Sequence, residues 1–294
     1  MRGFILNNGF YLSKAQIHKR ERIKEEFAKL DIRVDCLTSI DLDFAMKDSK
    51  IHLKNIENYD FCVYLDKDEN LAYAIQQFVP VFNSYEAISS CNDKVETYLK
   101  LSRSNVPTPL TIPSLLCYNL SNSAESIKKF LDYVEAKLSY PLVCKQCYGS
   151  LGLEVYLIND RDELEKKYAE LIKYPLLFQK YVKTFKGKDY RIFTIGGKAV
   201  ASMLRQNDKD FRSNIFLGGK GTFVHLPSET LAVAEKASKV LGLDYAGCDV
   251  LLDAEGKPTL IEVNSNAFLS EIEKVSKINI TKMLVQHIVS TLNR

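Results

Sequence analysis

Apolar and polar positions alternate between strand-like and helix-like stretches along the first part of the chain. Short apolar runs predict strands at Phe4–Leu6, Arg33–Leu37 and Phe61–Leu65, and a helical stretch, Ser13–Leu30, separates the first two. A short strand at Val79–Asn83 follows. Strands that alternate with helices favour a parallel sheet with crossover helices. We therefore expect an N-terminal α/β domain over residues 1–90.

The pattern changes at Asn92 and Asp93, either of which can cap a helix over Lys94–Arg103. The remaining elements mix both types, and in chain order they are a helix at Ser123–Leu138, a strand ending near Lys145, a strand after Gly152, strands at Leu176–Val182, Asp189–Ile195 and Ala199–Arg205, and helices at Leu231–Leu241 and Ile280–Leu292. We expect two α+β domains here, over residues 91–178 and 179–294.

A β-hairpin is predicted between Gly247 and Asn264, because two apolar runs flank the turn-rich segment Asp253–Pro258. Folding it at the Glu255–Gly256 bond places Asp249 opposite Glu262, with Asn264 on the same side. Like charges directly across a sheet are destabilising, so this arrangement favours a bound Mg²⁺ or Mn²⁺. On these residues alone, an edge hairpin with solvated acids is an equal alternative.

Composition narrows the classes of function only a little. The chain has 294 residues, 46% of them hydrophobic, and a net charge of +3, which gives no argument for nucleic-acid binding. No apolar run reaches membrane-spanning length, and the first residues do not resemble a signal peptide. The seven scattered cysteines favour a reducing compartment, the cytoplasm, although Cys144 and Cys147 leave a zinc or redox role as a minor alternative.

Two basic or glycine-rich segments are candidate anion sites. Lys145 precedes a loop with Gly149 and Gly152, and loop N–H groups with a nearby lysine suit phosphate oxygens. The order is not that of a Walker motif, in which the lysine follows the glycines. The basic stretch His18-Lys19-Arg20 on the first helix is expected to be a solvated face, with an anion site as the alternative.

Taken in order, these segments resemble the ATP-grasp ligases, and among them the RimK-like amino-acid ligases. Lys94 follows an N-D-K stretch similar to the first phosphate lysine, and Lys145 with its glycine loop resembles the second lysine and its flap. Gln179-Lys180-Tyr181-Val182 is similar to the adenine hinge, although Lys180 stands where glutamate is common. The other matching motifs are Asp189 with Arg191 (D-x-R), Asp210–Asn214 (D-F-R-S-N) and the triad Asp249, Glu262 and Asn264. The resemblance covers about Ser84 to the C-terminus.

The resemblance implies an ATP-grasp fold and an ATP-dependent carboxylate–amine ligase that works through an acyl phosphate. It would add glutamate or another amino acid to a carboxylate-bearing acceptor, which could be a small molecule, a peptide or a protein C-terminus. The implied cofactors are ATP and two Mg²⁺ or Mn²⁺ ions, and a homodimer or homotetramer is compatible with it. No membrane or nucleic acid is expected as a partner.

The resemblance also assigns roles to residues. Nucleotide binding is expected from Lys94, Lys145, Gly149, Ser150, Gly152, Gln179, Lys180, Tyr181, Val182, Asp189, Arg191 and Arg212. Catalytic roles are expected for Arg212, toward the γ-phosphate and the later oxyanion, and for Asn214 as an amide donor. Metal binding is expected from Asp249, Glu262 and Asn264.

Three alternatives remain open from the sequence. Arg191 and Arg205 could be salt-bridge residues of a sheet face or a clamp for a substrate carboxylate. A nucleotide-binding protein that has lost ligation is the second class of function. The general base toward the amine is not identified, since the four histidines are isolated.

The chain departs from the family directly after Asn264. RimK-type ligases typically continue S-P-G-L-E-G, whereas this chain continues Ser265-Asn266-Ala267-Phe268-Leu269. Glycine leaves open space and accepts a positive φ, whereas phenylalanine fills space. We expect this loop to border the acyl phosphate and the incoming amine, so that Phe268 reshapes the acceptor pocket. The alternative is that Phe268 turns inward as core.

Overall fold

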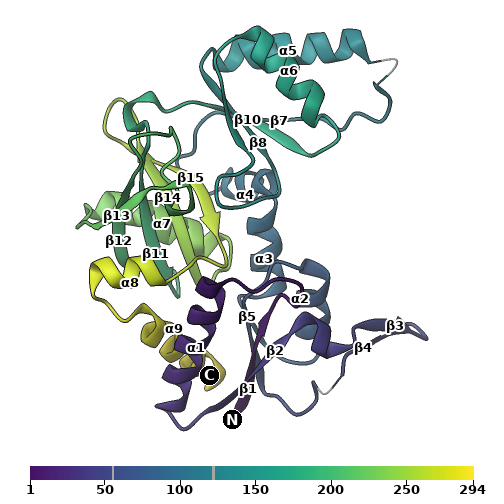
Figure 1. Ribbon diagram of the computed structural model, residues 1–294, viewed down its shortest axis with the longest axis vertical. Coiled ribbons are helices and arrows are strands. Elements are labelled where there is room, and N and C mark those ends of the chain that lie inside the picture. The colour runs from purple at the N-terminus through teal and green to yellow at the C-terminus, as the bar shows by residue number, and fades with distance from the viewer. Residues whose placement is uncertain (55, 121–122) are drawn as a thin grey trace.

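The computed structural model describes residues 1–54, 56–120 and 123–294. Three larger sheets follow one another along the chain, and Figure 1 shows them as three lobes, of which the first two are joined by helices α3 (Tyr85–Asn92) and α4 (Lys94–Leu101). The lobes correspond broadly to the three expected segments, while the division at residues 90 and 178 stays a prediction.

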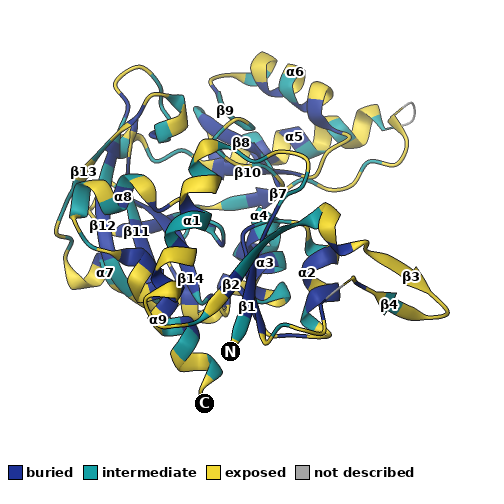
Figure 2. Ribbon diagram, turned by 60° about the horizontal axis from the view of Figure 1, so that its bottom comes forward, coloured by how far each residue is buried: buried dark blue, intermediate teal, exposed yellow. Residues whose placement is uncertain are grey.

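The first sheet is parallel, as the sequence predicts, with strand order β2-β1-β5-β6. Its strands are β1 (Arg2–Asn7), β2 (Arg33–Thr38), β5 (Phe61–Tyr64) and β6 (Val81–Phe82). The helices of this lobe are α1 (Lys14–Ala28), α2 (Glu69–Gln76) and α3 (Tyr85–Asn92). A hairpin that was not predicted, β3 (Ala45–Lys47) with β4 (Lys50–His52), projects from the lobe with mostly exposed residues (Figure 2).

The second sheet has the order β7-β10-β8-β9 and is antiparallel throughout. Its strands are β7 (Thr111–Pro113), β8 (Leu142–Gln146), β9 (Val155–Ile158) and β10 (Leu176–Lys180). Helix α4 (Lys94–Leu101) leads into this lobe, and α5 (Ala124–Leu138) and α6 (Arg161–Leu171) belong to it. Asp93 is the N-cap of α4, and its carboxylate accepts from the N–H of Val95 at 2.7 Å.

The third sheet is also antiparallel, with the order β13-β12-β11-β14-β15. Its strands are β11 (Lys188–Ile195), β12 (Lys198–Gln206), β13 (Lys220–Phe223), β14 (Tyr245–Leu252) and β15 (Pro258–Asn264). Helices α7 (Ser228–Val240), α8 (Ser270–Ser276) and α9 (Ile280–Leu292) complete the lobe.

The β14–β15 hairpin confirms the predicted pairing of Asp249 with Glu262 and adds a β-bulge. The pairing is regular from the turn as far as Val250 with Leu260, and the register then shifts so that Asp249 pairs with Glu262. Ile261 is therefore the extra residue on β15, and both Ile261 and Glu262 face the cavity described below. The carbonyl oxygen of Ile261 accepts from the Tyr98 hydroxyl at 2.6 Å, which anchors the bulge to α4.

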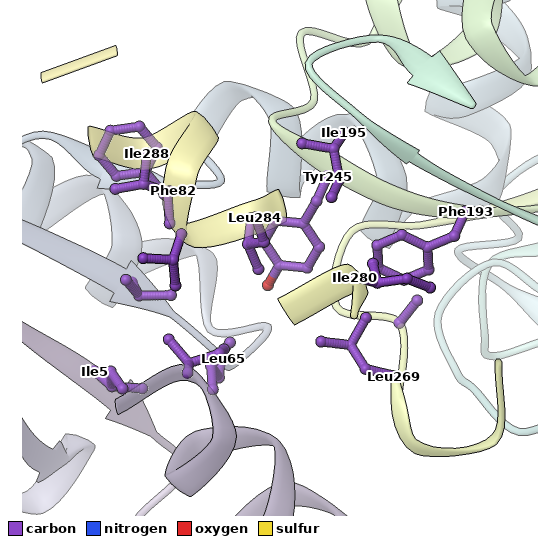
Figure 3. Close-up of a cluster of buried hydrophobic side chains, with 14 of the residues drawn as sticks. Ile5, Leu65, Phe82, Phe193, Ile195, Tyr245, Leu269, Ile280, Leu284 and Ile288 are labelled. Atoms are coloured by element: carbon purple, nitrogen blue, oxygen red, sulfur yellow. The ribbon is translucent and has the colours of Figure 1, made fainter. Parts of the chain in front are cut away.

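The first and last parts of the chain share a hydrophobic core, shown in Figure 3. Ile5 and Leu65 of the first lobe lie in one cluster with Tyr245, Leu269 and Leu284. Asn83, which is 1% exposed, adds polar links across the same boundary. Its amide donates to the carbonyls of Tyr245 and Ser265 at 2.9 and 2.8 Å and accepts from the N–H of Asp244 at 2.6 Å. The first lobe is thus fixed to the ends of β14 and β15.

Every helix in the described part of the chain falls short of the length and hydropathy that a bilayer crossing needs.

Candidate active site

An open cavity lies where the second and third sheets meet α4, and its space of about 830 Å³ includes the solvent at its mouth. Of the residues predicted for the site, all line the cavity except Arg191 and Asn264. Asn264 is the last residue of β15 and pairs with Gly247, while Arg191 is held in the ion pair described below.

The two predicted phosphate lysines reach the cavity from different elements. Lys145, on β8, is 7% exposed, and its ammonium donates to Oε1 of Gln179 at 2.8 Å. Burial lowers the pKa of Lys145 to about 8. Lys94, the first residue of α4, donates to the carbonyl oxygens of Gly149 and Cys147 at 3.2 and 3.4 Å. Both ammonium groups can therefore act on one bound polyanion.

The loop between β8 and β9 requires glycine at two positions. Gly149 has φ +136° and Gly152 has φ +77°, which side-chain-bearing residues rarely adopt. A Cβ at Gly149 would lie 2.6 Å from Oε2 of Glu154, and a Cβ at Gly152 would lie 2.6 Å from Oδ1 of Asn214. The predicted flap thus lies against Asn214 of the D-F-R-S-N segment.

The predicted adenine hinge forms the end of β10 and the residues that follow it. Gln179 is buried and its amide donates to Oγ1 of Thr111 at 2.8 Å, while the side chain of Lys180 is exposed. The backbone N–H of Lys180 donates to the carbonyl of Leu110 at 2.9 Å. A buried Tyr181 hydroxyl has no hydrogen-bond partner among the described residues. Gln179, Lys180 and Tyr181 all line the cavity, so the predicted hinge lies in its wall, with the Lys180 side chain exposed there.

Arg212 connects the D-F-R-S-N segment with the flap. Its guanidinium donates to the carboxylate of Asp210 at 2.7 and 3.0 Å and to the carbonyl of Gly152 at 2.6 Å. The Asp210 carboxylate raises the pKa of Arg212, so the group stays charged. Contact with a γ-phosphate would require Arg212 to exchange its bond to Gly152 for one to the phosphate.

Two aspartates and two arginines form a buried network beside the cavity. Arg205 donates to Asp189 at 2.6 and 2.7 Å and also pairs with Asp249 at 2.7 Å, and Arg191 holds both oxygens of Asp249. Arg191 and Arg205 therefore form salt bridges within the sheet, as one of the two alternatives from the sequence predicted. The hydroxyl of Ser213 donates to Asp189, so this carboxylate, predicted to contact the nucleotide, is already engaged.

The carboxylate oxygens of Asp249 and Glu262 fit a hard divalent cation. Although burial alone would raise the pKa of Asp249, Arg191 and Arg205 hold it below its ordinary value, so the carboxylate is ionised. Oδ1 of Asp249 accepts from one arginine nitrogen and keeps a second lone pair. Glu262 faces the same cavity, and its only ion-pair partner among the described residues is Lys94, at 3.9 Å. Carboxylate and amide oxygens suit Mg²⁺ and Mn²⁺.

Lys67 is a charged group near this site that the sequence analysis did not identify. It follows β5, and its carbonyl accepts from the amide of Asn92, two residues before Lys94. Burial lowers the pKa of Lys67, whereas the nearby Glu262 opposes that effect and Lys94 adds to it. Ligand sites in parallel sheets form beyond the carboxyl ends of the strands. Asp66-Lys67-Asp68 directly follow such a strand, so this rule would have identified Lys67 as a candidate.

The loop after Asn264 has one inward and one outward residue. Ala267 is buried in the shared core, whereas Phe268 is 40% exposed. The alternative in which Phe268 turns inward as core is therefore wrong, because Ala267 occupies that place. A role for Phe268 in substrate choice stays a prediction.

Comparison with known proteins places the chain among ligases. A sequence model of the RimK-like ATP-grasp domain matches residues 91–288. The relative named "Uncharacterized protein MG012 homolog" of Mycoplasma pneumoniae is 26% identical over 288 residues, 97% of this chain and 98% of that protein. "Probable alpha-L-glutamate ligase 2" of Shewanella denitrificans is 30% identical over 270 residues, 88% of this chain and 86% of that protein.

A mammalian relative matches over a shorter share of its length. N-acetylaspartylglutamate synthase A of Mus musculus is 32% identical over 213 residues, which are 71% of this chain and 54% of that protein. This chain thus spans about half of that synthase.

Solved structures share the whole fold at low sequence identity. D-alanine–D-alanine ligase from Bacillus anthracis complexed with ATP gives a TM-score of 0.73 at 19% identity, over 100% of this chain and 98% of that chain. The RimK domain protein ATP-grasp from Sphaerobacter thermophilus gives a TM-score of 0.72 at 17% identity, over 98% of this chain and 100% of that chain. The predicted fold class, a mixed α/β ATP-grasp fold, is confirmed.

Proposed function

This chain belongs to the RimK-like ATP-grasp family and is an ATP-dependent ligase that forms carbon–nitrogen bonds, and we propose that it joins the amine of an amino acid to a substrate carboxylate. Glutamate is the first candidate for the amino acid, because relatives are named as glutamate ligases and as a synthase of a glutamate-containing product. The observation that carries the proposal is that Lys94, Lys145, Arg212, Asp249 and Glu262 line one cavity.

The first step is transfer of the γ-phosphoryl group. A carboxylate oxygen of the substrate attacks the γ-phosphorus of ATP, the bond to the β-phosphate oxygen breaks, and ADP leaves. Lys94 and Lys145 hold the nucleotide phosphates, and Arg212 stabilises the charge that grows on the transferred group. The hinge at residues 179–182 orients the adenine, and Glu262 lines the same cavity.

The second step forms the amide. The amine nitrogen attacks the carbonyl carbon of the acyl phosphate, and phosphate leaves with the electron pair of the broken C–O bond. The amine loses its proton to phosphate or water. Arg212 and the Asn214 amide stabilise the tetrahedral oxyanion, a role supported by the fact that both line the cavity with the flap.

Asp249 and Glu262, with Asn264 at the end of β15, would hold two Mg²⁺ or Mn²⁺ ions, which supply charge neutralisation on the β- and γ-phosphates. The chain's own contribution is to keep Asp249 ionised, through Arg191 and Arg205, and to hold Glu262 opposite it in the hairpin. A reducing compartment such as the cytoplasm is the proposed location, because all seven cysteines are free thiols.

The test is ADP release from Mg·ATP with a panel of amino acids, each paired with a panel of carboxylates, followed by mass measurement of the product. Release that needs one amine and one carboxylate, with a product heavier by the amino acid minus water, is the expected result. Tight ATP binding without any release that depends on an amine would instead identify a nucleotide-binding protein that does not ligate.

A further inference from the structure

Lys19 has an unusual environment for a lysine. It lies on α1, in the basic stretch expected to be a solvated face, yet it is only 3% exposed. Its ammonium donates to Oδ1 of Asn266 at 2.8 Å and to the carbonyl of Ala267 at 2.9 Å. It also lies 3.5 Å from the Tyr245 hydroxyl and 4.7 Å from the centre of the Tyr245 ring. No ion pair in the described part of the chain includes Lys19, so the expectation of a solvated face is wrong for this residue.

Packing alone does not account for a lysine at this position. Burying an ammonium group without a carboxylate is costly, and burial lowers the pKa of Lys19 to about 7. Methionine has a similar length and would fill the space without that cost. What the ammonium adds is its pair of hydrogen bonds to Asn266 and Ala267.

Both hydrogen bonds end on one short loop, Ser265–Leu269, which we call the acceptor loop. It directly follows Asn264 of β15 and precedes α8. Asn83 holds the start of the loop through the carbonyl of Ser265, and Lys19 holds the next two residues. With Ala267 fixed in the core, the exposed Phe268 has its direction set by these contacts.

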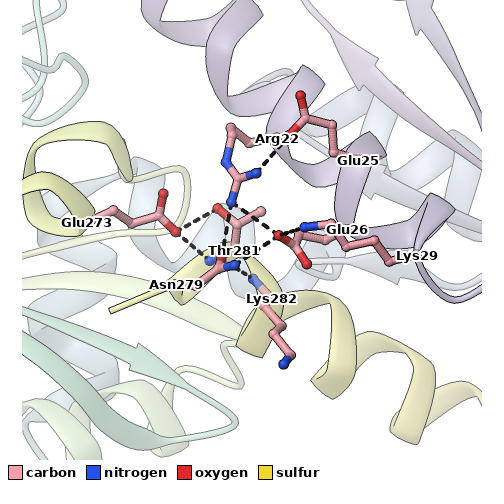
Figure 4. Close-up of polar contacts among 8 residues, drawn as sticks. All are labelled: Arg22, Glu25, Glu26, Lys29, Glu273, Asn279, Thr281 and Lys282. Atoms are coloured by element: carbon pink, nitrogen blue, oxygen red, sulfur yellow. Dashed lines mark hydrogen bonds and ion pairs between the residues drawn. The ribbon is translucent and has the colours of Figure 1, made fainter. Parts of the chain in front are cut away.

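Helix α1 is itself held firmly, so it can act as the support for this loop. Figure 4 shows Arg22, one turn after Lys19, bonded to Glu26 at 3.2 Å and to Asn279 at 3.3 Å. Asn279 in turn donates to Glu26 at 2.9 Å. Ile23 and Phe27 of the same helix lie in the core shared with α9.

We propose that Lys19 is a positioning residue that fixes the acceptor loop and, through Phe268, determines which amine substrate the enzyme accepts. The part of this inference that concerns amine choice rests on the proposed function. The part that concerns the loop does not.

The loop is tested without any substrate, by amide hydrogen exchange followed by mass spectrometry on Lys19→Met. Exchange in residues 265–270 should accelerate by at least roughly tenfold, because the loop loses two of its hydrogen bonds. The melting temperature should change little, since removal of a buried charge offsets the loss of the two hydrogen bonds. Lys24→Met, an exposed lysine of the same helix, is the matched control and should change neither. Unchanged exchange in the loop would overturn the proposal.

A second variant, Asn266→Ala, tests the same contact in case Lys19→Met fails to fold. Asn266→Ala removes one partner of Lys19 and leaves α1 intact, so it should also accelerate exchange in the loop. In the double variant, Lys19→Met with Asn266→Ala, the increase in exchange rate should be smaller than the two single increases combined. This is expected because the two groups act together. Fully additive effects would show that Lys19 does not act through Asn266.

Amine choice is tested with the substrates that support turnover. The KM for glutamate should rise about tenfold in Lys19→Met, while the KM for ATP and the ADP release with hydroxylamine as the amine stay unchanged. An unchanged KM for glutamate would refute control of amine choice by Lys19. Should the unmodified enzyme release no ADP with any amine, the proposed function fails, and the exchange experiment still decides the role of Lys19 in the loop.

Discussion

The ammonium of Lys94 lies 3.9 Å from Oε1 of Glu262 while it donates to the carbonyls of Cys147 and Gly149. One lysine thus contacts both the flap and a carboxylate of the proposed metal site. Because these contacts share one charge, a change at Glu262 should also alter the flap.

Glu262→Gln tests the metal assignment. Losing this anion should lower ATP-dependent turnover by a factor of ~100 or more, the scale of losing one strong transition-state contact. Folding should survive, because Glu262 is part-exposed and its loss removes one of two neighbouring carboxylates. ADP release measured against Mg²⁺ concentration checks this, with Glu255→Gln, an exposed residue of the same hairpin, as the control. Near-normal turnover in Glu262→Gln would show the metal assignment to be wrong.

Lys145 should give the reaction a pH dependence. Its pKa of about 8 in the free enzyme means that the ammonium is charged below this pH and neutral above it. The kcat/KM for ATP should therefore fall by roughly tenfold per pH unit above about 8. Lys145→Arg keeps its charge throughout, so this variant should lack the decline. A decline of equal size in both proteins would exclude Lys145 as its cause.

Arg212 and Lys145 should differ in which kinetic constant they affect. Lys145→Ala should chiefly raise the KM for ATP, because its phosphate contact exists before and during transfer. Arg212→Ala should chiefly lower kcat, by about 100-fold or more, because its partner charge grows during transfer. Arg33→Ala, whose side chain is 71% exposed, is the control for loss of an arginine. Equal effects on both constants in both variants would contradict this division.

Phe268→Gly tests the departure from the family pattern. We expect the loop of Phe268 to border the incoming amine, so removing the exposed ring should broaden or shift the preference among amino acids, with ATP affinity unchanged within a few-fold. Competition between pairs of amino acids, read by product mass, measures this. Leu115→Gly, another exposed apolar residue in a loop, should leave the preference unchanged. A loss of thermal stability with the same preference would show that the ring serves packing.

Asn83→Ala should destabilise the joint between the first lobe and the third sheet. The change leaves the carbonyls of Tyr245 and Ser265 and the N–H of Asp244 without their partner in a buried place. At roughly 1–3 kcal/mol for each unsatisfied group, at least about 2 kcal/mol of unfolding free energy should be lost. Urea unfolding of this variant and of the exposed Asn293→Ala measures the difference. A loss equal to that of the control would mean that the joint does not depend on Asn83.

The sequence predicted those parts of the fold whose residues carry a local signal. The β14–β15 hairpin has apolar strands and a turn-rich centre, and its pairing at Asp249 and Glu262 was correct. Strand β13 was missed because Lys220-Gly221-Thr222-Phe223 has little apolar character and is held as an edge strand by pairing with β12. Helix α6 was also missed, because its segment is mostly charged and buries only Leu164, Tyr168 and Leu171.

Contacts between distant segments account for what could not be predicted in the site. The resemblance placed Asp189 and Arg191 on the nucleotide, but their partners, Arg205 and Asp249, lie on other strands of the folded sheet. Lys19 looked like part of a charged helix face, because nothing in its neighbours along the chain reveals the loop and Tyr245 that bury it.

The bulge at Ile261 lets two consecutive residues of β15 face the cavity, where a regular strand would present only one. Val250 pairs with Leu260 before the bulge and Asp249 pairs with Glu262 after it, so the two carboxylates would stay opposite each other in a chain without Ile261. Such a chain would instead lose a cavity-lining side chain and the carbonyl that accepts from the Tyr98 hydroxyl. The inserted residue therefore serves the link between the hairpin and α4, and the register of the metal carboxylates does not depend on it.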